Sequence, residues 1–182
     1  MGLDSLEERK FSISMKRLNC IMDILFSKIR ESSITNRDQP IEWSIKHMYS
    51  CAQLSKLLAQ KRGFDIEIAG IAGVIHDLAI IKTGKFENHG SLGGPLVRDF
   101  LLEYNSRYGK EFGKIDKEDI DLIVNATINH TNKKYFDDSA FDELIKDVDS
   151  LDRFLHGLET FDYYLKRTKK ALKDLNLDID LF

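Results

Sequence analysis

The scarcity of helix breakers is the feature that most constrains the fold of this chain. Only two prolines, Pro40 and Pro95, occur in 182 residues, and long stretches repeat apolar residues with the 3.6-residue period of a helix. Within residues 14–31 the apolar positions follow i, i+4, i+7 and i+11, which places them on one stripe. The stripe consists of Leu18, Met22, Leu25 and Ile29. No segment alternates convincingly like a strand, so we predict an all-α fold.

Capping residues and breakers divide the chain into six or seven helices. Pro40 suits the first turn of the second helix, and Gly63 is a natural residue to end it. Asp65 can cap the start of a third helix that is rich in small residues. Residues 80–88 contain lysines and Gly84, which predicts a loop. The expected helices are 14–31, 40–62, 66–79, 90–107, 117–130, 140–155 and 158–175.

Composition excludes several classes of protein. A formal net charge of −3 gives no electrostatic reason to bind a nucleic-acid polymer or an anionic membrane. No apolar run approaches the roughly 18 residues of a membrane span, and residues 1–10 lack a signal-peptide apolar stretch. With Cys20 and Cys51 as the only cysteines, a disulfide framework is ruled out. We therefore expect a cytoplasmic protein.

Three of the five histidines fall on apolar or small-residue helix faces. His47 shares its face with Cys51, His76 lies beside the small residues of its helix, and His130 follows Ile123 by two turns. A single inward histidine is more often a hydrogen-bonded core residue than a ligand. Three neutral imidazoles from three helices have no obvious structural reason to converge. A divalent cation supplies one, because imidazole is its commonest nitrogen ligand in proteins.

Two aspartates complete this candidate metal site. Asp77 directly follows His76 at the expected end of a helix, where both side chains can reach one ion beyond that end. Asp149 lies between apolar neighbours on its helix. Asp147 and Asp152 fall on other faces of the same helix, and we interpret them as solvated.

The order His47, His76-Asp77, Asp149 resembles the H…HD…D signature of the HD-domain metal-dependent phosphohydrolase superfamily. Residues 69–78 look like the family's small-residue helix that ends in the HD doublet, and residues 147–152 are similar to its late D-A-D-x-L-D stretch. The resemblance covers about residues 42–154. It implies a single HD-like domain over residues 1–182, with helices 14–31 and 158–175 as flanking elements.

Two more histidines extend the resemblance. His89 lies in a segment that looks like the family's H-x-x-x-G, and His130 in one that looks like I-x-x-H. The resulting H…HD…H…H…D pattern is that of two-metal members, which include cyclic-dinucleotide phosphodiesterases, dinucleotide polyphosphate hydrolases and mixed-valent di-iron oxygenases. The chain lacks the G-Y-P triad of the first group. Its next glutamate after the doublet is Glu87, which is unlike the single-metal 5′-nucleotidases of the family.

The resemblance implies a ligand set and a reaction. His47, His76, Asp77 and Asp149 would hold one divalent ion, and His89 and His130 a second, with Asp77 as the bridging, catalytic residue. Mixed His and Asp ligands suit Mn, Fe, Co, Ni or Zn without choosing among them. A metal-bound hydroxide would then hydrolyse a phosphomonoester or phosphodiester, with a nucleotide as the expected small-molecule partner. The alternatives are a di-iron oxygenase on the same scaffold and a non-catalytic HD binding module.

A phosphorylated substrate also needs cationic side chains. We expect Lys82 and Lys85, in the loop after the HD doublet, to bind the substrate. Lys133 and Lys134 are further candidates, although solvated loop lysines are common. His156 lies seven residues beyond Asp149, too far to share its ion, and we interpret it as structural.

Overall fold

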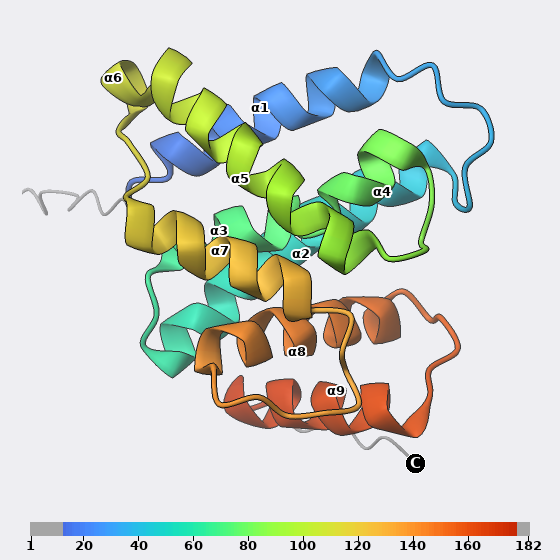
Figure 1. Cartoon of the computed structure of the whole chain (residues 1–182). Coiled ribbons are helices and arrows are strands. Elements are labelled where there is room, and N and C mark those ends of the chain that lie inside the picture. The colour runs from blue at the N-terminus through green and yellow to red at the C-terminus, as the bar shows by residue number, and fades with distance from the viewer. Residues whose placement is uncertain (1–12, 178–182) are drawn as a thin grey trace, which may run out of the picture.

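A computed structural model describes residues 13–177, and within this range the chain is helical without any strand (Figure 1). The all-α prediction is thereby confirmed. The expectations for residues 1–10, and the chain beyond residue 177, lie outside the described residues. No helix of the described part has the length and apolarity to cross a bilayer. The long helices are α1 (Lys16–Arg30), α2 (Ile41–Arg62), α3 (Ile66–Ile75), α5 (His89–Arg107), α7 (Lys117–Asn129), α8 (Ala140–Leu155) and α9 (Asp162–Asp174).

These seven helices match the predicted ones, but two short helices were not expected: α4 (Leu78–Thr83) and α6 (Gly109–Phe112). The predicted helix 66–79 is wrong at its end, because α3 stops at Ile75 and the chain turns at His76 and Asp77. The predicted loop 80–88 is wrong at its start for the same reason. All of Leu78–Ile81 is buried, so this apolar segment packs as a new helix instead of remaining a loop. The last predicted helix, 158–175, begins only at Asp162.

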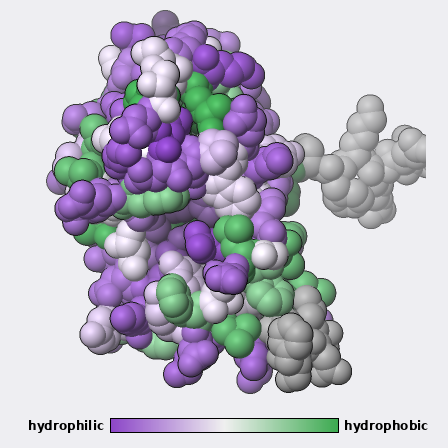
Figure 2. All heavy atoms as spheres, turned by 90° about the vertical axis from the view of Figure 1, so that its right-hand side faces the viewer, coloured by the Kyte–Doolittle hydropathy of each residue, from purple (hydrophilic) through white to green (hydrophobic). Residues whose placement is uncertain are grey.

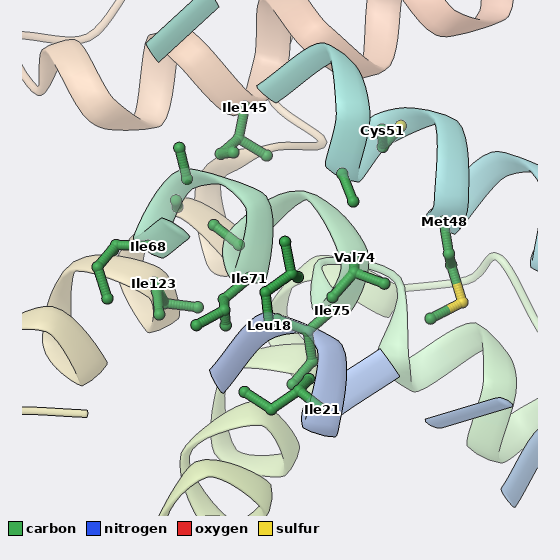
Figure 3. Close-up of a cluster of buried hydrophobic side chains, with 14 of the residues drawn as sticks. Leu18, Ile21, Met48, Cys51, Ile68, Ile71, Val74, Ile75, Ile123 and Ile145 are labelled. Atoms are coloured by element: carbon green, nitrogen blue, oxygen red, sulfur yellow. The ribbon is translucent and has the colours of Figure 1, made fainter. Parts of the chain in front are cut away.

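Helix α3 lies at the centre of the molecule and packs against α1, α2, α7 and α8. Its side chains form the middle of the apolar cluster in Figure 3, where Ile71 and Ile75 meet Leu18 and Ile21 of α1. The approach to α2 is unusually close at Gly73. A Cβ atom there would lie 2.6 Å from the Cys51 carbonyl oxygen, which only glycine avoids. This close packing positions the end of α3 beside the face of α2 that carries His47.

The polar network between α8 and α9 corrects the interpretation of Asp147 as solvated. Asp147 is fully buried, and its carboxylate accepts hydrogen bonds from Arg167 Nη1 (2.9 Å), Arg62 Nη2 (2.6 Å) and Lys170 Nζ (2.7 Å). Arg167 is also fully buried and donates to Glu143 (2.8 Å) and to carbonyls of the loop after α7. Burial of these charges is tolerated because they are paired. The network fixes α9 against α8 and against that loop.

Candidate metal centre

The structure brings all six predicted ligand side chains together, although they come from five separate parts of the fold. They are His47 on α2, His76 and Asp77 in the α3–α4 turn, His89 at the first residue of α5, His130 just after α7, and Asp149 on α8. Asp77 lies at the centre of the group. Its carboxylate oxygens are 3.3 Å from His130 Nε2, 3.4 Å from His47 Nε2 and 3.5 Å from His89 Nε2.

All four imidazoles are oriented in the same sense, with Nδ1 facing a hydrogen-bond acceptor and Nε2 facing the centre. An acceptor opposite Nδ1 fixes that nitrogen as the N–H donor, so Nε2 of the neutral ring carries the lone pair. The acceptors are the carbonyl oxygens of Gly73 for His76 (2.8 Å), Thr127 for His130 (2.6 Å) and Phe86 for His89 (2.5 Å), and the Asp152 carboxylate for His47 (2.6 Å).

This orientation makes the residues fit divalent cations. The Nε2 atoms of His47 and His76 are 3.3 Å apart, and those of His89 and His130 are 3.1 Å apart. Two lone pairs at such distances repel unless one ring of the pair takes up a proton or an ion lies between them. Asp77 Oδ1 is also buried without a hydrogen-bond partner among the described residues, which is costly for a carboxylate. A cation between each pair of imidazoles would relieve both problems.

The electrostatics of the site also favour positive charge at its centre. Burial lowers the pKa of His76 to about 4, so the ring stays neutral and keeps its lone pair at neutral pH. Burial also lowers the pKa of His47, but contacts with Cys51, Asp152 and Asp77 outweigh it and raise that pKa well above its ordinary value. Without an ion the His47 ring therefore takes up a proton, so the site favours positive charge at the place that the first ion would occupy.

A cavity of about 360 Å³ lies against this group of residues. Its size falls within the range of small-molecule sites. It opens on the side of the molecule seen in Figure 2, where the surface is hollowed between an upper and a lower half. The lining includes His47, Asp77, His89 and Asp149, and also Gln39, Trp43, Ile80, Phe86, Thr131, Lys133, Arg153 and Tyr164.

The cations at the cavity are only in part the predicted ones. Lys82 lies near the end of α4 and Lys85 in the loop after it; that loop borders the cavity through Phe86, but neither lysine lines it. Lys82 is exposed, and Lys85 Nζ is paired with Asp38 at 2.8 Å. The lining contains Lys133, one of the further candidates, and Arg153, which was not predicted. Binding of substrate by Lys82 and Lys85 stays a prediction without a contact to support it.

Asp152 is a site residue that the sequence interpretation missed. It was interpreted as solvated, yet it is buried and accepts hydrogen bonds from His47 Nδ1 and from the Ser50 hydroxyl. A carboxylate in this place orients the imidazole and makes Nε2 a better ligand. Asp152 could have been found from the sequence by its spacing of three residues from Asp149 on α8, because residues i and i+3 lie on one helix face. His156 packs edge-on against Trp43, with ring centroids 4.9 Å apart, in line with its structural interpretation.

One prediction concerns the positioning of His89. The Asp38 carboxylate accepts hydrogen bonds from the Phe86 N–H (2.9 Å) and from Lys85 Nζ, and the Phe86 carbonyl lies 2.5 Å from His89 Nδ1. We expect Asp38→Ala to weaken binding of an ion at His89 by roughly tenfold, as for other outer partners of ligating histidines. Metal titration measures this. Lys85→Ala removes the ion pair alone and should weaken binding less; an equal loss in both variants would contradict positioning through Phe86.

Comparison with known proteins agrees with this geometry. The HD domain family model matches residues 44–154, a segment that includes all six predicted ligands and more than half of the chain. No curated protein and no solved structure shows significant similarity to the chain. Asp38, Tyr164 and Arg167 lie outside the matched segment, whereas the central cluster lies within it. The chain therefore belongs to the HD domain family.

Proposed function

We propose that this protein is a metal-dependent phosphohydrolase that acts on a phosphomonoester or phosphodiester, with a nucleotide as the substrate. One observation carries the proposal: four histidine Nε2 atoms and two aspartates converge beside one cavity, which four of these six residues line. Membership of the HD domain family supports it, because this family consists in general of metal-dependent hydrolases. Hydrolysis adds water across a P–O bond, with the hydroxyl going to phosphorus and a proton to the leaving oxygen.

The ligand roles follow from which atoms face each other. His47, His76 and Asp149 would hold one ion, and His89 and His130 the other. Asp77 Oδ2 faces His47, whereas Asp77 Oδ1 faces His130, so one carboxylate can serve both ions. Mn, Fe, Co, Ni and Zn suit this donor set. When bound, such ions polarise a phosphoryl oxygen and lower the pKa of a bound water.

The other cavity residues would orient ligands and substrate. Asp149 turns Oδ1 toward His47 at 3.5 Å and Oδ2 toward the Lys133 ammonium, which holds the carboxylate in place. Burial raises the pKa of Asp149, but Lys133 and then His47 outweigh it and keep that pKa well below its usual range. The aromatic ring of Trp43 lines the same cavity, and stacking on such a ring suits a nucleobase.

The test combines metal analysis with a phosphate-release screen. The purified protein should contain one or two transition-metal ions per chain. Removal of these ions with a chelator should abolish phosphate release from nucleotides, dinucleotides or sugar phosphates, and Mn, Co, Ni, Fe or Zn should restore it. The control is Asp121→Ala, which changes a carboxylate that is absent from the cavity lining and paired with Arg98, and it should keep the metal content.

Three results would overturn the proposal. Full phosphate release by chelator-treated protein would exclude a metal-dependent reaction. Oxygen-dependent turnover with a redox-active iron pair would instead indicate an oxygenase. Loaded protein that binds nucleotides without hydrolysing any compound of the screen would indicate a binding module.

A further inference from the structure

The two cations that line the cavity differ in how they are neutralised. Lys133 is buried, contacts the Asp149 carboxylate and donates to the His130 carbonyl oxygen at 2.7 Å. Arg153 pairs with no carboxylate anywhere in residues 13–177, and its buried Nε lacks a hydrogen-bond partner there. An arginine has five N–H donors, and a donor that is buried without a hydrogen-bond acceptor costs free energy. Arg153 is therefore the cation of this cavity with donors available for a ligand.

Tyr164 of α9 holds the Arg153 side chain in place. The guanidinium carbon lies 5.3 Å from the centre of the Tyr164 ring, within range of a cation–π contact. This contact is made through the guanidinium carbon and uses none of the N–H groups, which remain available for a bidentate contact. Tyr164 is itself fixed, because Arg167, less than one turn further along α9, is anchored by Glu143 and Asp147.

Arg153 lies one helical turn beyond the predicted ligand Asp149. It follows Asp149 by four residues on α8, so both side chains lie on one face of the helix. Four residues correspond to a rise of about 6 Å along the axis. A group that contacts Arg153 and a group held beside Asp149 would therefore be neighbours along one wall of the cavity.

We propose that Arg153 and Tyr164 form an anion subsite for a second phosphate group of the substrate. The inference rests on the proposed function, in which the first phosphate lies at the metal centre. Planar guanidinium donors match two phosphate oxygens. The substrate class is then a nucleotide with two phosphate groups, such as a nucleoside diphosphate or bisphosphate, in preference to a monophosphate.

The test is the selectivity of the metal-loaded enzyme for a second phosphate. It is the ratio of kcat/KM for adenosine 5′-diphosphate, or adenosine 3′,5′-bisphosphate, to kcat/KM for adenosine 5′-monophosphate. We expect Arg153→Gln to lower this ratio roughly tenfold to a hundredfold, the usual effect of losing hydrogen bonds to a charged group. The control is Arg98→Gln, since Arg98 lies on α5, is paired with Asp121 and is remote from the cavity lining. It should leave the ratio unchanged.

Equal losses for all three compounds would leave the ratio unchanged and overturn the subsite, because Arg153 would then contact the scissile phosphate. Arg153→Lys keeps the charge without the planar fork and should give an intermediate ratio, which provides a second variant if Arg153→Gln folds poorly. Metal content is measured for every variant.

A binding measurement separates failure of the subsite from failure of the proposed function. Calorimetric titration of the metal-loaded protein with inorganic phosphate and with inorganic pyrophosphate, at constant excess metal, needs no turnover. Tighter binding of pyrophosphate that depends on Arg153 supports the subsite even if no compound is hydrolysed. The same preference in wild type and Arg153→Gln would overturn it, whatever the hydrolysis screen shows.

Discussion

Replacement of Asp77 by alanine is expected to remove both bound ions and at least about a hundredfold of kcat/KM. Loss of an outer partner alone costs roughly tenfold to a hundredfold in other metal sites. Asp77 faces His47 through one oxygen and His130 through the other, so its loss would affect both ion positions at once. Metal analysis and kinetics on the same preparations measure the two effects. Lys82→Ala, which changes an exposed side chain outside the cavity lining, should cost at least tenfold less activity.

Two further variants test whether Asp77 bridges the two ions. His89→Ala removes a residue that faces only one oxygen of Asp77, so it should lower the metal content by one ion. Asp77→Asn keeps the size of the side chain but removes its charge, and should resemble Asp77→Ala in metal content. Retention of one ion by both Asp77 variants would assign this residue to a single ion of a two-metal site and contradict its bridging role.

Most of the helical fold could be predicted because its signals are local. Gly63, expected to end the second helix, does so with a left-handed φ of 76°. Asp65, expected to cap the third, accepts a hydrogen bond from the Ile68 N–H at 2.8 Å. The break at His76 and Asp77 could not be predicted in this way. It depends on burial of Leu78–Ile81 against other helices, which local propensity does not encode.

The central cluster was within reach of the sequence, because each inward histidine lies on a helix face whose period can be counted. Its surroundings were not. Asp152 and His47 are 105 positions apart, and no local pattern links a carboxylate on one helix to an imidazole on another. Because Lys85 follows Asp77 closely in the sequence, it was predicted to bind the substrate. In the structure its ammonium group pairs instead with Asp38, which lies in the loop between α1 and α2. Pairing between distant charges is set by tertiary structure alone.

Replacement of Asp147 by alanine is expected to give the largest loss of stability among the substitutions considered. Removing one partner of a buried ion pair costs about 3–5 kcal/mol, because the remaining charge is left without compensation. Typical domains are stable by only about 5–15 kcal/mol, so the loss should be evident in chemical unfolding. The matched control is Asp121→Ala. Its partner is Arg98, both side chains are about two-fifths exposed, and such surface pairs contribute about 0–1 kcal/mol.

The partners of Asp147 decide where in this range the effect falls. Lys170 is 41% exposed and can turn to water, whereas Arg167 is fully buried and cannot. Arg167 keeps Glu143 at 2.8 Å, which compensates part of its charge. We therefore expect a loss near the lower end, about 3 kcal/mol, seen as a lower urea midpoint with an unchanged slope. A loss no larger than that of Asp121→Ala would mean that the network is solvated in solution, and that Arg167 does not hold α9 in place.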